Sequence, residues 1–95
     1  MRRPAIIVGR DAFARQAMQH ANGTVTVVPI TSNVERVYEF QVFLPAGTGG
    51  ISRDSKAQAE QIRTISVNRL KERLGVVSET TSQELDGAIR LYLGL

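Results

Sequence analysis

Thr24-Val25-Thr26-Val27-Val28-Pro29-Ile30 is the stretch that indicates the fold most clearly. Its first half alternates polar and apolar side chains, and its second half is apolar throughout. Alternation that uses β-branched residues is typical of a strand with one buried face. Pro29 has no N–H to donate to a neighbouring strand, so it marks a sheet edge, a bulge or the end of the strand.

Shorter elements are expected on both sides of this strand. Ala5-Ile6-Ile7-Val8 is wholly apolar and rich in β-branched residues, which predicts a buried strand. Residues 11–20 are mixed in polarity and predict either a short helix or an ordered loop. Residues 40–44 and 73–77 are predicted strands, and residues 67–70 are predicted to form a single helical turn.

Residues 55–66 predict two strands rather than one. Their apolar positions follow a period of two at first, but the alternation breaks between Ala59 and Ile62. We therefore expect two strand segments that are joined by a bend at Glu60-Gln61.

The C-terminal residues carry the pattern of a helix. Thr81 with Glu84 three residues later fits a capping box at its start. Gly87 lies inside the pattern, where it costs about 1 kcal/mol against Ala, and it predicts a close packing contact. One apolar stripe recurs at helical spacing, formed by Leu85, Ala88, Ile89, Tyr92 and Leu93.

The chain is predicted to be a single, mainly β domain over residues 1–95. Its 95 residues leave no room for a second core, and 42% of them are hydrophobic. Five or six short strands and a C-terminal helix indicate a small, strongly bent sheet or barrel.

The composition excludes several classes of protein. No apolar run approaches the roughly 20 residues that span a bilayer, so no membrane protein is expected. The chain has no cysteine, which excludes disulfides and thiolate metal sites and favours a cytoplasmic location. Lys and Arg total 12 against 9 for Asp and Glu, and the resulting charge of +3 permits a polyanionic partner without requiring one.

Most catalytic templates fail for lack of the necessary residues. His20 is the single histidine, which excludes a two-histidine ribonuclease site within one chain and a histidine metal cluster. We interpret His20 as a solvated loop residue. The glycines at 47, 49 and 50 are not followed by Gly-Lys-Ser/Thr, so they predict a flexible hairpin loop and no phosphate loop.

The remaining charged residues each allow two interpretations. Asp54 and Glu60 could pair for acid–base catalysis, or Asp54 could cap a turn while Glu60 neutralises an arginine. The cations Arg53, Lys56 and Arg63 could line a phosphate groove or be exposed strand residues.

Four segments in one order resemble the MazF/PemK family of small bacterial toxins, and the resemblance runs from residue 2 to the end of the chain. The C-terminal helix, with Leu85-Asp86 and then Ile89-Arg90-Leu91-Tyr92-Leu93, also looks like the family's last helix. The four segments are Arg3-Pro4-Ala5-Ile6-Ile7-Val8, Val27-Val28-Pro29-Ile30-Thr31-Ser32-Asn33, Arg53-Asp54-Ser55 and Glu60-Gln61-Ile62-Arg63-Thr64-Ile65.

The resemblance implies an SH3-like barrel of the PemK/MazF/CcdB type with a terminal helix, assembled as a homodimer. It implies a toxin of a type II toxin–antitoxin system that cuts single-stranded mRNA at specific sequences without a metal or another cofactor. The products are a 2′,3′-cyclic phosphate and a 5′-hydroxyl. The implied partners are single-stranded RNA and an antitoxin of the MazE type, and no membrane.

The family pattern also implies the site residues. The catalytic arginine before Pro falls on Arg3, and the catalytic threonine that ends the Pro-Ile-Thr strand falls on Thr31. A guanidinium can serve two oxygens at once, and a hydroxyl can donate to the phosphate, where the transition state builds negative charge. The RNA-binding residues are expected to be Ser32, Asn33, Arg53, Glu60 and Gln61.

One departure from the family leaves alternatives open. Family members usually begin with a strand of the type Gly-Glu-Ile-Trp-x-Val-Asp-Leu and a loop with Gly-Ser-Glu, which this sequence lacks, so we expect the first family strand to be missing. The alternatives to a nuclease are therefore a truncated, non-cleaving member that binds only antitoxin or RNA, and a CcdB-like toxin directed at gyrase.

Overall fold

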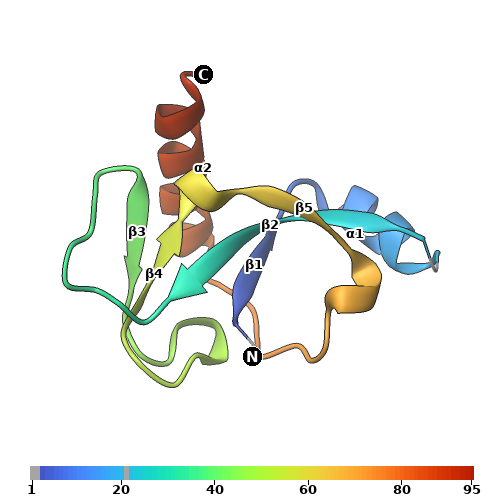
Figure 1. Cartoon of the computed structure of the whole chain (residues 1–95), viewed down its shortest axis with the longest axis horizontal. Helices are drawn as coiled ribbons and strands as arrows, with labels where there is room; N and C mark the ends of the chain where they lie inside the picture. Colours follow the sequence, from blue (N-terminus) through green and yellow to red (C-terminus); the bar gives the residue numbers. More distant parts are fainter. Residues whose placement is uncertain (1–2, 21) are drawn as a thin grey trace.

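β2 (Thr24–Thr31) is the central strand of the computed structural model, which describes residues 3–20 and 22–95. In that part of the chain five strands form one curled antiparallel sheet in the order β1-β2-β4-β3, with β5 also paired to β2 (Figure 1). The remaining elements are β1 (Ala5–Val8), α1 (Asp11–Met18), β3 (Gln41–Leu44), β4 (Ser55–Gln58), β5 (Arg63–Ser66), α2 (Glu79–Leu93) and the short 3₁₀ helices η1 (Thr48–Gly50), η2 (Ala59–Gln61) and η3 (Val67–Arg69).

β2 has two neighbours on one of its sides. Its first half pairs with β5, with Val25 opposite Ile65, and its last residues pair with β4, with Ile30 opposite Ala57. One stretch of chain can supply both neighbours because η2 bends it between β4 and β5. The predicted pair of strands with a bend at Glu60-Gln61 is therefore confirmed, and this bend makes the sheet curl.

Pro29 lies where β2 changes neighbour. The amide of Ile30 donates to the carbonyl oxygen of Pro4 (3.0 Å), so the nitrogen of the preceding residue points to the opposite side of the strand. On that side the pairing with β5 ends at Val27 and the pairing with β4 begins at Ile30. The missing N–H of Pro29 therefore falls in a gap of the ladder, and the strand continues to Thr31.

The core lies between one face of the sheet and α2. Alternate residues of β2, Val28 and Ile30, are buried on this face, and Leu85 and Ala88 of α2 pack into the same cluster. The predicted apolar stripe of the helix is thus confirmed for its first half. Tyr92 and Leu93 near the end of α2 stay about half exposed. The rest of the buried cluster consists of Val42, Leu44, Ile51, Ala57 and Ala59.

β1 forms as predicted, but the expectation that it is buried was wrong. β1 pairs with β2 alone in the described sheet, so it is an edge strand. Ile6 and Val8 pack against the core, whereas Ala5 and Ile7 point to the other face and are exposed. An apolar run without alternation hides this difference between the two faces.

The predicted strand over residues 73–77 was also wrong, because this segment has no regular structure. It runs against the loop between β3 and β4, and the approach is so close that only glycine fits. A Cβ added at Gly75 would lie 2.7 Å from the carbonyl oxygen of Gly49. A Cβ added at Gly50 would lie 2.3 Å from the carbonyl oxygen of Leu74. Leu74 and Val76 remain exposed.

α2 begins three residues earlier than the capping-box pattern predicts. Ser78 is the N-cap, and its hydroxyl oxygen accepts a hydrogen bond from the amide of Thr81 (3.1 Å). The predicted close contact at Gly87 is absent, because a Cβ there would meet no atom of another described segment within 4 Å. The helix ends at Gly94, whose φ of 74° suits glycine.

The prediction of a short helix after β1 is confirmed by α1, and η3 confirms the helical turn near residue 67. His20 is exposed beyond the end of α1, as expected. No helix in the described ranges is long and apolar enough to cross a membrane.

Candidate nucleic-acid interface

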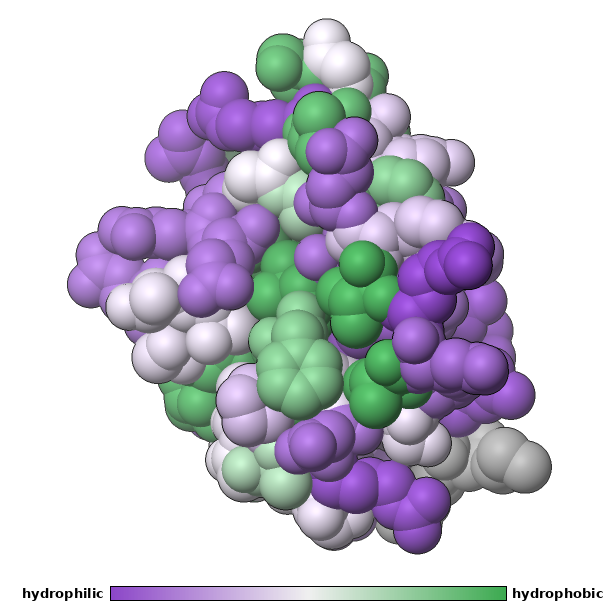
Figure 2. All heavy atoms as spheres, turned by 90° about the vertical axis from the view of Figure 1, so that its left-hand side faces the viewer, coloured by the Kyte–Doolittle hydropathy of each residue, from purple (hydrophilic) through white to green (hydrophobic). Residues whose placement is uncertain are grey.

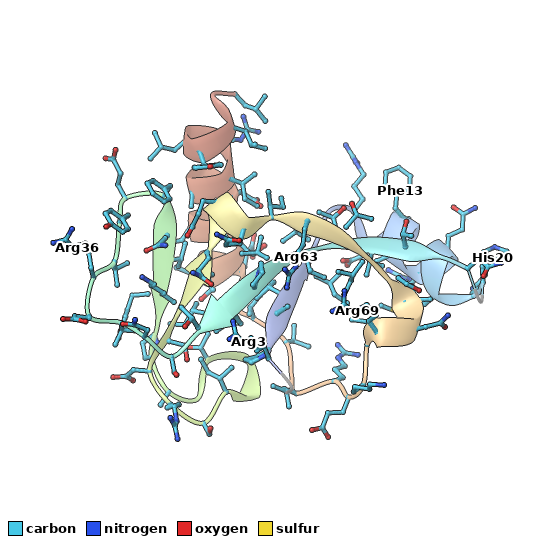
Figure 3. All side chains as sticks on the ribbon, viewed as in Figure 1. Arg3, Phe13, His20, Arg36, Arg63 and Arg69 are labelled. Carbon is cyan, nitrogen blue, oxygen red and sulfur yellow. The ribbon has the colours of Figure 1, made fainter. Side chains whose placement is uncertain are left out.

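Arg3 and Thr31 are brought together by the pairing of β1 with β2. The register places Ala5 opposite Pro29, and the hydrogen bond from the Ile30 amide to the Pro4 carbonyl continues it by one residue. The next residues along the two chains, Arg3 and Thr31, therefore face each other across the ladder. Opposed residues of an antiparallel pair direct their side chains to the same face of the sheet. Figure 3 shows Arg3 close to the tip of β2.

The hydroxyl of Thr31 keeps its proton available. Its oxygen accepts a hydrogen bond from the backbone amide of Asn33 (3.3 Å), and the residue is only partly buried at the end of β2. A hydroxyl that accepts through a lone pair can still donate its O–H to another group. Arg3 is exposed, so its guanidinium is accessible to a ligand on this face.

Ser32 and Asn33 form the turn that follows β2, and both are exposed. The side-chain oxygen of Asn33 accepts from the amide of Glu35 (3.2 Å), which orients this turn. The two candidate RNA contacts in this segment thus lie directly beside Thr31.

Lys56 is a site residue that sequence reasoning did not select, although it was one of three cations that could line a phosphate groove. It is opposite Thr31 in the β2–β4 pairing, so a row of side chains runs from Arg3 through Thr31 to Lys56. Lys56 is only 8% exposed. Its ammonium donates to the carbonyl oxygen of Arg36 (2.6 Å) and lies 5.9 Å from the centre of the Tyr38 ring.

A hollow of about 520 Å³ opens beside this row. Its lining residues come from the loop after β2 and from β4: Asn33, Glu35, Arg36, Tyr38 and Lys56. Arg36 extends outward from this loop, as Figure 3 shows, and its guanidinium lies 5.6 Å from the centre of the Tyr38 ring.

Glu60 is connected to the same loop through Gln41. The side-chain amide of Gln41 donates to Glu60 Oε2 (2.9 Å), while Gln41 Oε1 accepts from the backbone amide of Tyr38 (3.0 Å). The second carboxylate oxygen of Glu60, Oε1, is buried and has no hydrogen-bond partner among the described residues. It is thus a free acceptor at the end of a hydrogen-bonded chain that begins at the hollow. Gln61 follows it and is exposed.

The structure excludes the idea that Asp54 and Glu60 form an acid–base pair. They lie at opposite ends of β4, and each has its own neutral partner. Asp54 accepts from the backbone amide of Ala46 (2.9 Å), which confirms that it caps a turn. Glu60 is bound by Gln41 and, among the residues that the structure describes, by no arginine.

Arg53 makes no contact with the other candidate residues in the described part of the chain. It is exposed in the loop between β3 and β4, where its carbonyl oxygen accepts from the hydroxyl of Ser55 (2.9 Å). This loop lies at the same end of the sheet as the beginning of β1 (Figure 1). Arg63 is exposed on β5, farther along β2 and opposite Val27.

In the described ranges no group of three or more His, Cys, Asp or Glu side chains is arranged to hold a metal ion. The groups that the interface offers are cations, hydroxyls, amides, carboxylates and the half-exposed aromatic ring of Tyr38. Cations and hydroxyls bind phosphate oxygens, and an aromatic ring can stack on a base.

Comparisons with known proteins identify the relatives of this chain. A family model described as PemK-like, MazF-like toxin of type II toxin–antitoxin system matches residues 1–93. Endoribonuclease MazF9 of Mycobacterium tuberculosis is 47% identical over 93 residues, which cover 98% of this chain and 79% of that protein. Endoribonuclease MazF of Staphylococcus saprophyticus is 32% identical over 94 residues, which cover 98% of this chain and 74% of that protein.

Solved structures share the fold. The Mycobacterium tuberculosis toxin MazF-mt6 has a TM-score of 0.83 at 26% identity and covers 98% of this chain and 87% of its own. A MazE–MazF crystal structure from Deinococcus radiodurans has a TM-score of 0.77 at 26% identity, with coverage of 99% and 84%. The predicted fold class, a curled sheet with a C-terminal helix, is thereby confirmed.

Proposed function

The chain belongs to the PemK-like, MazF-like toxins of type II toxin–antitoxin systems, and we propose that it is an endoribonuclease that cuts single-stranded mRNA at specific sequences without a metal ion. Two curated relatives of high coverage carry the name endoribonuclease, which supports the activity. The proposed products are a 2′,3′-cyclic phosphate and a 5′-hydroxyl.

The placement of Arg3 opposite Thr31 is the single observation that carries this proposal. The register of β1 against β2 puts a guanidinium and a free hydroxyl proton on one face of the sheet, at a strand end that is open to solvent. Both groups can donate hydrogen bonds, and neither is engaged with a carboxylate of the described ranges. Such a pair suits a phosphodiester, which offers two non-bridging oxygens.

The proposed reaction uses a nucleophile that the RNA itself supplies. The 2′-hydroxyl attacks the neighbouring phosphorus, the bond to the 5′-oxygen breaks, and one proton leaves the 2′-oxygen while another reaches the 5′-oxygen. No water is consumed, so no metal-bound hydroxide is needed. Negative charge grows on the non-bridging oxygens in the transition state, and Arg3 and Thr31 stabilise it there.

The RNA contacts are proposed to extend from this pair along both sides. Ser32 and Asn33 follow Thr31 directly, and Arg53 is exposed at the same end of the sheet. Glu60 is linked through Gln41 to the Tyr38 amide of the loop that lines the hollow, and Gln61 follows it with an exposed side chain that can hydrogen-bond a base. These five residues are the candidate determinants of the target sequence.

We also propose that the toxin is a homodimer and binds an antitoxin of the MazE type. Complexes of MazE with MazF are solved for Deinococcus radiodurans. The chain exposes a surface that suits a protein partner: Figure 2 shows apolar side chains gathered among hydrophilic ones on the face beside β3. Phe43 is exposed on β3, and the centres of the Phe40 ring and of the Tyr92 ring of α2 lie 5.3 Å apart.

Light scattering during size-exclusion chromatography tests this assembly. The purified chain is expected to elute with twice its own mass, and with a larger mass after co-expression with the antitoxin. A monomer at micromolar concentration that gains no mass with antitoxin would contradict both parts of the proposal.

Cleavage in the presence of EDTA is the direct test of the function. The wild-type chain is expected to cut a long single-stranded RNA in EDTA, leaving 5′-hydroxyl ends that polynucleotide kinase labels without prior phosphatase treatment. The double variant Arg3→Ala/Thr31→Val, purified in the same way, controls for contaminating nucleases. If the wild-type chain binds the RNA without cutting it, the nuclease proposal is refuted and the chain is an RNA-binding protein instead.

A further inference from the structure

Lys56 carries a positive charge that the protein itself does not neutralise. The side chain is 8% exposed, and within residues 3–20 and 22–95 its ammonium contacts the Arg36 carbonyl oxygen and the face of the Tyr38 ring. No carboxylate of the described chain lies within ion-pair distance of it. A buried ammonium without a counter-ion is costly, since it loses water and gains little in return.

Neither contact of Lys56 supplies a negative charge. The Arg36 carbonyl is a neutral acceptor, and the Tyr38 ring attracts the ammonium only weakly, through its quadrupole. An ammonium has three protons, of which the carbonyl takes one. The others are left for a group in the hollow, which Lys56 helps to line.

The position of Lys56 indicates which group that is. Its Cβ lies about 5 Å from that of Thr31, as for any directly opposed pair of an antiparallel sheet, and Thr31 in turn faces Arg3. The hollow therefore adjoins the place where the proposed reaction holds the scissile phosphate. The side chains around it include two cations, Arg36 and Lys56, and one exposed carboxylate, Glu35, so the lining has a net positive charge.

We propose that Lys56 binds a second phosphate of the RNA, the one next to the scissile phosphate, in the hollow formed with the loop from Asn33 to Tyr38. This inference rests on the proposed nuclease function and deepens it by naming a phosphate subsite. The RNA backbone supplies the anion that Lys56 lacks, and Lys56 fixes the register of the strand over Arg3 and Thr31. It is a substrate-binding residue and does not touch the reacting atoms.

Salt dependence of binding separates this role from a structural one. The probe is a single-stranded oligonucleotide with 2′-deoxy sugars, which lacks the nucleophile and stays intact. Lys56→Met is expected to weaken binding about tenfold, as the loss of a charge-assisted hydrogen bond does. The slope of log K against log salt is expected to become shallower by about 0.7, the value for one phosphate contact in a single strand.

Two further variants make the test specific. Lys56→Gln keeps a donor for the Arg36 carbonyl but loses the charge, so it should lose the same part of the salt slope as Lys56→Met. Lys71→Met removes the chain's other lysine, which is exposed in the segment before α2, and should bind like wild type. A Lys56→Gln variant that binds like wild type would assign Lys56 to anchoring the loop and overturn the proposal.

A measurement on the wild-type chain avoids the risk that a variant does not fold. The chain has two lysines, so its ¹⁵N-labelled side-chain ammonium signals can be assigned with Lys71→Met. The Lys56 signal is expected to shift when the oligonucleotide is added. Binding without such a shift would overturn the phosphate subsite alone. Failure of the wild-type chain to bind at any salt concentration would overturn the nuclease function and this inference together.

Discussion

Replacing Arg3 with alanine is expected to lower the rate of RNA cleavage by about 10²- to 10³-fold, which is the usual effect of removing one donor from a charged transition state. Arg3 precedes β1 and is exposed, so its loss creates no cavity and the melting temperature should stay within error. Single-turnover cleavage of a defined RNA measures the rate, and thermal unfolding checks the fold.

Two further variants serve as controls for the Arg3→Ala result. Arg3→Lys keeps the charge without the planar fork, so it should recover part of the lost activity but not all of it. Arg10→Ala removes the same charge from the opposite end of β1, where the side chain is exposed and caps no helix amide. Equal losses in Arg3→Ala and Arg10→Ala would point to a general charge effect, and full activity of Arg3→Ala would refute the assignment of the site.

The periodicity of the sequence correctly predicted those strands and helices that have one buried face and one exposed face. The first half of β2 alternates because Val25 and Val27 are buried while Thr24 is exposed. In its second half Val28 and Ile30 join the core cluster that also sets the stripe of α2. The stretch 73–77 carries apolar residues too, but nothing buries Leu74 or Val76. Their placement follows from a close approach of two backbones at Gly50 and Gly75, and no local pattern of side chains encodes such an approach.

The same limit applies to the site. Arg3 and Thr31 could be named from the sequence because the family motifs carry them, while their proximity depends on a register that only β1 and β2 together define. The role of Lys56 could not be predicted from the sequence, because it follows from three contacts in the fold. One is with Thr31 across the ladder, and the others are with Arg36 and Tyr38, which lie in a loop without periodicity. A polar residue in a short strand looks exposed in the sequence, and here it is buried.

Gln41 was missed for a related reason. As the first residue of β3 it reads as a polar strand end, yet it is buried and connects the Tyr38 amide to the Glu60 carboxylate. This chain of hydrogen bonds replaces the arginine that the sequence led us to expect beside Glu60. It leaves Glu60 Oε1 as a free acceptor, which no inspection of the residue's sequence neighbours could reveal.

Replacing Thr31 with valine is expected to reduce cleavage about 10²-fold, because valine has the same branched shape and lacks the donor. The substitution also removes the acceptor for the Asn33 amide, which lies at an exposed turn where water can take its place. Binding of the uncleavable deoxy oligonucleotide should therefore change far less than the rate. Thr31→Ser retains the hydroxyl and should cut within about tenfold of wild type.

Thr24→Val is the matched control for Thr31→Val, since it removes a threonine hydroxyl from the other, exposed end of the same strand. Its activity should equal that of wild type. If Thr31→Val lost binding and rate in equal measure while Thr31→Ser restored both, the hydroxyl would serve the turn and not the phosphate. If the hydroxyl acts only in the transition state, its removal must instead lower the rate at which bound RNA is cleaved and leave binding nearly unchanged.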